Sequence, residues 1–192
     1  MPASPARSPL AGVRVVECSM LGPAAITTHL ADLGADVIKV ESPAGDYIRR
    51  MTWPIVEGVS LMHLHINRGK RSVVLDLTTD EGRQRLRQLA ATADVLIESD
   101  RPGRMAELGL GYEQLAAEHP HLVYVSISPY GQTGPKAQWA ADDLNVMASA
   151  ATLSVTGDED RPPVRVAVPQ GYHFGAVSAA SGLTSPRGRA PC

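Results

Sequence analysis

Five short segments rich in β-branched residues alternate with helix-like segments along most of this chain, and this alternation limits its possible folds more than any other feature. The predicted strands cover residues 13–17, 36–41, 72–76, 94–98 and 122–127. The predicted helices cover residues 24–33 and 78–91, a short stretch around residue 105, and residues 112–118. Strands and helices that alternate in this way form a parallel sheet most economically, because each crossover helix covers one face. The sequence therefore predicts an α/β fold with helices on both faces of a parallel sheet.

The helix before the fourth strand has a recognisable start. Thr78-Thr-Asp-Glu81 has the Ser/Thr-x-x-Glu form of a capping box, in which the hydroxyl and the carboxylate each accept a backbone N–H. Leu86, Leu89 and Ala90 are spaced to supply the apolar face of this helix. Beyond residue 128 the pattern predicts a Gly/Pro loop, a helix over residues 143–151, a short strand over 164–168 and a small-residue helix over 175–182.

The composition is that of a globular protein. Of 192 residues, 44% are hydrophobic and 20% are charged, and no triplet repeat occurs, which excludes disorder and collagen. The net charge of −2 lacks the broad positive field of a sequence-independent nucleic-acid binder, so no nucleic-acid partner is expected. No apolar run approaches the roughly 20 residues of a membrane span, and the first ten residues lack a signal-peptide core. A cytoplasmic protein with no membrane association is expected.

Several motifs with known chemistry are absent from the sequence. Cys18 and Cys192 lie near opposite ends with no CxxC, so neither a zinc site nor a disulfide framework is expected, and we predict no metal. The segment 109–114 begins like a dinucleotide fingerprint but lacks the third glycine and follows a helix. Gly69-Lys70 lacks the upstream glycine of a P-loop. An NAD-dependent oxidoreductase is therefore only a weak alternative.

Small and polar residues follow four of the predicted strands, at 19–23, 42–45, 99–103 and 128–131. Parallel sheets bind ligands at the carboxyl ends of their strands, so these segments are candidates for a binding site. Arg68, Lys70 and Arg71 surround Gly69 in the segment that begins at Asn67. Cations beside a glycine that permits close backbone approach suit a phosphate-bearing ligand. A solvated loop before a strand is the alternative interpretation.

Five segments together resemble the family III CoA-transferases, which include formyl-CoA transferase, carnitine CoA-transferase and alpha-methylacyl-CoA racemase. The segments are 10–17, 22–23, 30–41, 67–77 and 126–135, and the resemblance runs in order to about Leu183. It implies a Rossmann-like large domain over residues 10–183 that binds the nucleotide and pantetheine arm of coenzyme A. Residues 1–9 are then expected to be a disordered leader and residues 184–192 an unstructured tail.

The resemblance also implies what surrounds this domain in whole family members. They are about twice as long and close into a ring that interlocks with a second copy, forming a homodimer. From about Thr184 the chain changes to Arg, Pro and Ser residues without apolar periodicity. The sequence is therefore expected to be truncated before the second domain, and an interlocked homodimer is not expected of this chain by itself.

One position departs from the chemistry that the resemblance implies. Transferases of this family use an Asp as nucleophile, which forms an anhydride with the acyl group and then a thioester with CoA, before an acceptor carboxylic acid takes the CoA. The position that matches this Asp is Tyr172. A phenol with a pKa near 10 does not supply the same chemistry at neutral pH. The chain is thus interpreted either as a divergent CoA-transferase or as a catalytically inactive CoA-binding remnant.

A racemase-like acyl-CoA enzyme is a further alternative, because that branch uses a His and an Asp as acid and base on opposite faces of the substrate. These two positions match Asp142 and Tyr172, so both roles are unmet. Asp142 is a candidate nucleophile or base, with a helix N-cap as the alternative role. His173, beside the aromatic residue, is a candidate substitute base, with a structural or solvated histidine as the alternative.

The coenzyme A contacts implied by the resemblance are only partly kept. Residues that follow the family pattern or belong to the basic segment are Gly22, Pro23, Asn67, Arg68, Gly69, Lys70 and Arg71. Ser42 stands where a basic residue flanks the adenine, Ser99 and Asp100 replace an Asn-Phe pair, and Glu107 replaces an Arg. These changes remove cations or an apolar wall and add negative charge, so weaker binding of CoA is predicted. The expected substrates are an acyl-CoA and a carboxylic acid.

Overall fold

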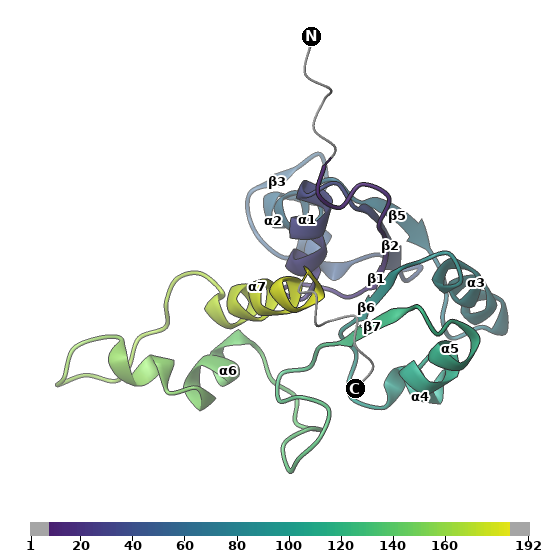
Figure 1. Ribbon diagram of the computed structural model, residues 1–192. Coiled ribbons are helices and arrows are strands. Elements are labelled where there is room, and N and C mark those ends of the chain that lie inside the picture. Colours follow the sequence, from purple (N-terminus) through teal and green to yellow (C-terminus); the bar gives the residue numbers. More distant parts are fainter. Residues whose placement is uncertain (1–7, 185–192) are drawn as a thin grey trace, which may run out of the picture.

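The computed structural model describes residues 8–184 and has an α/β architecture (Figure 1). A five-stranded sheet has the order β5-β2-β1-β6-β7, and every neighbouring pair is parallel. Its strands are β1 (Arg14–Cys18), β2 (Asp36–Glu41), β5 (Arg71–Val74), β6 (Val95–Glu98) and β7 (Val123–Ser126). All five predicted strands of the sheet are confirmed, with ends that differ by one or two residues. The predicted leader and tail lie almost entirely outside the described residues.

Helices cover both faces of the sheet, as predicted. One face packs against α1 (Ala24–Asp32) and α7 (Gln170–Thr184), and the other packs against α3 (Asp80–Ala90), α4 (Arg104–Glu107) and α5 (Tyr112–Glu118). Neighbouring residues of one strand feed opposite cores, because side chains alternate across a sheet. Val15 lies in the core beneath α1, whereas Val16 lies in the core beneath α3. Both faces of the sheet are thus covered by apolar side chains, which is typical of parallel sheets.

The start of α3 differs from the predicted capping box. Thr79, not Thr78, is the N-cap, and its hydroxyl accepts the Gly82 N–H at 3.1 Å. Thr78 instead donates to the Asp76 carboxylate at 2.6 Å. Gly82 is required at this turn, because a Cβ there would lie 1.9 Å from the Asp76 carbonyl oxygen. The predicted apolar face is confirmed, with Leu86 fully buried in the core.

A segment between β2 and β5 was not predicted as structured. It holds η1 (Tyr47–Arg50), the short antiparallel pair β3 (Ile55–Val56) and β4 (Val59–Ser60), and α2 (Leu61–Ile66). Its strands have only two residues each, too few for a periodic signal. Ile48 and Ile66 anchor the segment, because they pack against Leu21 and Ala24 at the start of α1.

Residues 129–169 form an arm that leaves the sheet after β7 and carries α6 (Asp143–Ser149) and η2 (Thr152–Val155) (Figure 1). The predicted strand over residues 164–168 is wrong. Val164 donates its N–H to the Thr156 carbonyl, but no strand pairs with it in the described part of the chain. Val164 and Val168 are exposed, and β-propensity alone does not make a strand without a partner surface.

The helix α7 begins five residues earlier than predicted, at Gln170 rather than at Gly175. The Asp143 carboxylate, from α6, accepts the Tyr172 N–H at 3.1 Å and so satisfies a free donor of the first turn of α7. This cap comes from a residue 29 positions away, which no local pattern reveals. Tyr172 and His173 therefore lie inside the helix.

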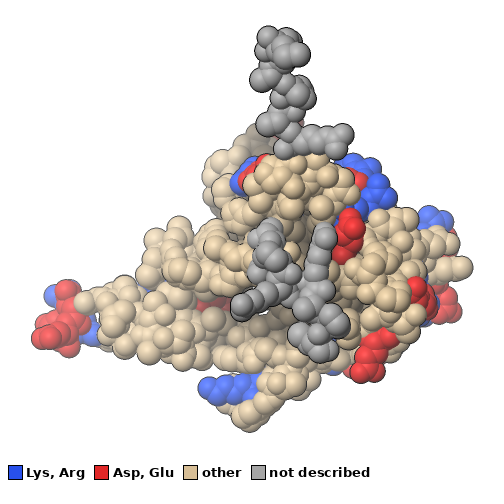
Figure 2. Space-filling model, viewed as in Figure 1, with Lys and Arg blue, Asp and Glu red and all other residues tan. Residues whose placement is uncertain are grey.

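Charge is unevenly distributed over the face shown in Figure 2, where the surface of α7 and the adjoining arm carries few charged side chains. Acidic and basic residues gather instead at the far tip of the arm and near the helices on the opposite side of the sheet. Within residues 8–184, no helix has both the length and the apolar character needed to cross a membrane.

Candidate functional site

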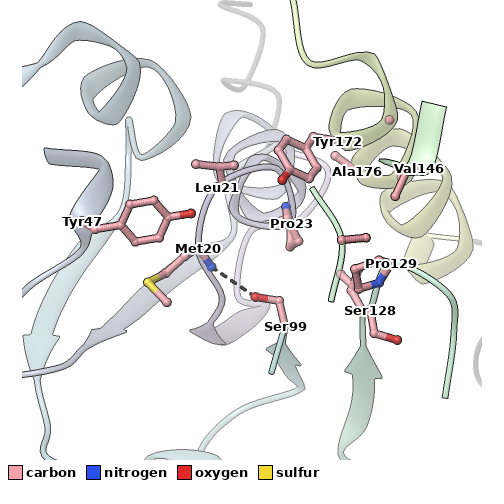
Figure 3. Close-up of a pocket in the computed structure, with 14 residues that line it drawn as sticks. Met20, Leu21, Pro23, Tyr47, Ser99, Ser128, Pro129, Val146, Tyr172 and Ala176 are labelled. Atoms are coloured by element: carbon pink, nitrogen blue, oxygen red, sulfur yellow. Dashed lines mark hydrogen bonds between the residues drawn. The ribbon is translucent and has the colours of Figure 1, made fainter. Parts of the chain in front are cut away.

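The strand order reverses between β1 and β6, and this reversal creates the candidate site. From β1 the chain continues to β2 and β5 on one side of the sheet, then returns to β6 and β7 on the other. The loops that follow β1 and β6 consequently diverge, and parallel α/β sheets bind ligands in the crevice between such loops. A cavity of about 340 Å³ lies at this point (Figure 3).

Several elements that are distant in sequence line the cavity. Its lining residues are Met20, Leu21, Pro23, Tyr47, Ser99, Ile127, Ser128, Pro129, Ala141, Val146, Gly171, Tyr172, Gly175 and Ala176. Three of the four predicted strand-end segments contribute, those after β1, β6 and β7. The segment after β2 does not, because Ser42 lies in an exposed turn where its hydroxyl faces the Gly45 carbonyl at 3.4 Å.

The loop after β1 is held to its neighbour across the reversal point. Met20 donates its N–H to the Ser99 hydroxyl at 3.3 Å, which joins the loops after β1 and β6. Leu21 has a φ of +56°, and α1 begins after Pro23. Gly22 sits directly under Tyr172, because a Cβ on Gly22 would lie 2.0 Å from the Tyr172 Cβ. Only glycine lets α7 approach the loop this closely, so Gly22, Pro23 and Tyr172 are brought together.

Tyr172, the position of the family's Asp, is half-buried at the edge of the cavity. Its ring packs against the cluster that contains Leu21 and Ile48. Burial raises the pKa of the Tyr172 phenol. A hydrogen bond from the Asp143 N–H lowers it and the carboxylates of Asp142 and Asp143 raise it, and the net direction is upward. The phenol is therefore neutral at physiological pH, able to donate a hydrogen bond but unsuited to nucleophilic attack.

The other two candidate catalytic residues lie outside the cavity lining. Asp142 caps α6 in a capping box, since its carboxylate accepts the Asn145 N–H and the Asn145 side chain accepts the Asp142 N–H, both at 3.1 Å. This is the alternative role considered for Asp142. His173 is exposed on α7, whereas the lining residues of that helix lie on another face, at Gly171, Tyr172, Gly175 and Ala176.

Each cation of the basic segment has a carboxylate partner within the described part of the chain. The Arg68 guanidinium pairs with Asp32, and Arg71 pairs with Asp36. Asp36 is the first residue of β2, so Arg71 lies at the opposite edge of the sheet from the cavity. Gly69 has a φ of +75°. None of the residues 67–71 lines the cavity.

Lys70 belongs to a buried network of four charged side chains that was not predicted from the sequence. Its Nζ lies 2.9 Å from Glu17, and Lys39 lies 3.2 Å from Glu17 and 3.1 Å from Asp46. Two carboxylates and two ammonium groups balance one another. Burial lowers the pKa of Lys70 to about 8. The only sequence signal for the network is the charge of Glu17 and Lys39 inside otherwise apolar strands.

This network holds both ends of the loop after β1, which lines the cavity. The Lys39 Nζ donates to the Ser19 carbonyl at 2.6 Å, and the Lys70 Nζ donates to the Ala24 carbonyl at 2.6 Å. Lys70 also donates to the Asn67 side-chain oxygen at 3.1 Å. Both lysines are bound to the Glu17 carboxylate, so one buried anion fixes the loop that carries Gly22.

Asp100 lies in the loop after β6, next to Ser99, but does not line the cavity. Its N–H donates to the Glu98 carboxylate at 2.7 Å. Burial raises the pKa of both carboxyl groups. Within residues 8–184, no group of three or more His, Cys, Asp or Glu side chains is arranged to hold a metal ion, and the expectation of no metal stays a prediction.

Comparisons with known proteins identify the class to which this fold and cavity belong. The family model described as CoA-transferase family III matches residues 10–185, so the chain belongs to that family. Succinyl-CoA:glutarate CoA-transferase of Mus musculus is 42% identical over 163 residues, covering 83% of this chain and 37% of that protein. Succinate–glutarate CoA-transferase of Agrobacterium fabrum is 41% identical over 186 residues, covering 92% of this chain and 46% of that protein.

A solved structure agrees with the sequence relatives. A CAIB/BAIF family protein from Brucella suis has a TM-score of 0.88 and 39% identity, over 95% of this chain and 50% of that chain. The chain therefore spans half or less of the length of these proteins. Membership of the family is confirmed, and the alternative of an unrelated NAD-dependent oxidoreductase is excluded.

Proposed function

We propose that this chain contributes the CoA-binding portion of an enzyme that moves CoA between an acyl-CoA and a carboxylic acid. The observation that carries the proposal is the cavity at the reversal point of the sheet, where Gly22 and Tyr172 meet in a chain of CoA-transferase family III. A CoA thioester would enter this cavity with its carbonyl group toward Tyr172. The loop after β1, which contributes Met20, Leu21 and Pro23 to the lining, would lie against the pantetheine arm.

The chemistry proposed for this chain differs from that of an Asp nucleophile. No carboxylate lines the cavity in the described residues, and the Asp142 carboxylate is engaged as a cap. The neutral Tyr172 phenol would donate a hydrogen bond to the thioester carbonyl oxygen and polarise it. The acceptor carboxylate would attack the carbonyl carbon and expel the CoA thiolate. The thiolate would then attack the acceptor's carbonyl in the mixed anhydride and release the donor carboxylate.

Kinetics with the purified chain test this proposal, using an acyl-CoA and a carboxylate acceptor. A direct transfer predicts sequential kinetics and no acyl group attached to the protein, because covalent enzyme intermediates give ping-pong kinetics. Tyr172→Asp would restore the family's nucleophile and add an acyl-enzyme that hydroxylamine traps. Tyr172→Asn, of matched size but unable to attack, is the control. Trapping of an acyl group on the unmodified chain would contradict the direct transfer.

The second candidate is a CoA-binding protein without transferase activity, which the lack of a carboxylate in the described cavity lining favours. Tight CoA binding with no turnover in the same assay would support it and overturn the transferase proposal. A racemase-like activity would instead exchange the hydrogen on the carbon next to the thioester, which deuterium uptake from heavy water detects. A cytoplasmic location and a substrate pair of acyl-CoA and carboxylic acid belong to the same proposal.

A further inference from the structure

The lining of the cavity has no charged side chain among its fourteen residues, which lie within the described part of the chain. Most of them are apolar or glycine. The polar side chains are two serines, Ser99 and Ser128, and two tyrosines, Tyr47 and Tyr172. A ligand that fills this cavity therefore meets hydrocarbon surface and a few neutral hydroxyl groups, which is the usual character of a small-molecule pocket.

Three of the four polar side chains accept a hydrogen bond from a neighbouring N–H, namely the two serines and Tyr172. The Ser99 hydroxyl accepts the Met20 N–H, and the Ser128 hydroxyl accepts the Gln132 amide at 3.2 Å. The Tyr172 phenol oxygen accepts a hydrogen bond from the Asp143 N–H, but within residues 8–184 neither the Tyr172 nor the Tyr47 O–H donates to a protein acceptor. Figure 3 shows both phenolic oxygens directed toward the same space. A carbonyl oxygen in that space would accept from both donors.

A negatively charged group on the buried acyl chain would be disfavoured among these lining residues. Asp142 and Asp143 are close enough to raise the pKa of Tyr172, so their charges extend to the cavity. The charge of Arg165 lowers the pKa of Tyr172, but this side chain is exposed and does not line the cavity. A carboxylate buried here would lose water without gaining a cation. Each methylene group of a ligand that is buried here would raise the binding constant of that ligand about fourfold.

We infer that the cavity takes the uncharged hydrocarbon acyl group of a CoA thioester, rather than a dicarboxylic acyl group such as succinyl, with the thioester oxygen bound by Tyr47 and Tyr172. The inference rests on the proposed function and adds its substrate class. It distinguishes this chain from the two relatives named for succinyl and glutarate substrates.

Butyryl-CoA and succinyl-CoA test the inference directly, because they have four-carbon acyl groups of similar shape that differ in a terminal methyl or carboxylate. Calorimetric titration of the chain with each, and with free CoA, gives three dissociation constants. Butyryl-CoA is expected to bind at least tenfold more tightly than succinyl-CoA. Equal or tighter binding of succinyl-CoA overturns the inference and leaves the proposed function standing. Failure of CoA and of both thioesters to bind overturns the proposed function itself.

Variants of lining residues provide the matched controls. Tyr47→Phe and Tyr172→Phe are each expected to weaken the binding of butyryl-CoA by about 2- to 10-fold, which is the range of one neutral hydrogen bond. The binding of free CoA is expected to stay unchanged. Val146→Lys places a cation in the lining and is expected to reverse the preference toward succinyl-CoA, whereas Val146→Met is not. If Val146→Lys weakens both thioesters equally, the acyl group does not occupy this cavity and the inference is wrong.

Discussion

Gly22 and Tyr172 form the contact on which the cavity depends. The absence of a side chain on Gly22 lets the first turn of α7 lie against the loop after β1, and this contact places the Tyr172 ring over the apolar cluster. The resemblance to family III CoA-transferases singled out both residues from the sequence. Their direct contact is a property of the folded chain, because they are 150 positions apart in the sequence.

Gly22→Ala is expected to destabilise the protein by about 1–3 kcal/mol, the usual cost of overpacking a well-filled site. The new Cβ would lie 2.0 Å from the Tyr172 Cβ, so the helix or the loop must move. Urea unfolding at neutral pH measures the change. Gly182→Ala is the control, since no atom lies within 4 Å of its added Cβ. Equal stabilities of the two variants would contradict this packing of α7 against the loop after β1.

At the scale of elements, Glu41 at the end of β2 holds η1, which carries the cavity residue Tyr47. The Glu41 carboxylate accepts the Asp46 N–H at 2.9 Å, Arg49 at 2.7 Å and Ser72 at 2.6 Å. Burial by itself would raise the pKa of Glu41, but these hydrogen bonds lower it to about 2. The carboxylate form thus fastens η1 to the sheet.

This pKa predicts a stability change in acid. Because the folded-state pKa lies below the ordinary value of 4.5, the stabilisation is complete above about pH 4.5 and is lost as the pH falls toward 2. Glu41→Gln is expected to cost about 1–2 kcal/mol at pH 7, allowing for solvent screening around Arg49. The difference from the unmodified chain should shrink between pH 4.5 and pH 2 in urea unfolding. A constant difference would show that Glu41 acts by packing rather than by charge.

At the scale of the whole molecule, the cavity is lined by residues from the sheet loops, the η1 segment, the arm and α7 (Figure 3). Leu21 comes from a sheet loop, Tyr47 from η1, Val146 from the arm and Ala176 from α7. A ligand in this space contacts all four parts at once, and these parts lie together only in the folded chain. It therefore binds the folded chain and not the unfolded one.

Coenzyme A at millimolar concentration is expected to raise the midpoint of a cooperative thermal transition of the chain. A ligand present at a hundred times its dissociation constant stabilises the native state by about 2.7 kcal/mol. Differential scanning calorimetry measures the shift, and NAD at the same concentration is the control. A transition unmoved by CoA, or moved equally by NAD, would contradict specific binding at the reversal point.

The sequence by itself determined the sheet and most of its helices, because β-branched runs and apolar helix spacing are local signals that the tertiary structure did not override. The motifs of residues 10–17, 30–41 and 126–135 also determined the family. The failed strand at residues 164–168 shows the limit of such signals, since a strand needs a neighbour as well as the right residues.

Only the tertiary structure decided how the candidate site is arranged. It paired Arg68 and Arg71 with carboxylates, put Asp142 in a helix cap, and brought Tyr47 to the cavity that contains Tyr172. The physical reason is that charge pairing, burial and close approach depend on distances in space. Those distances are set by residues far apart in the sequence. They lie near one another because the strand order reverses between β1 and β6.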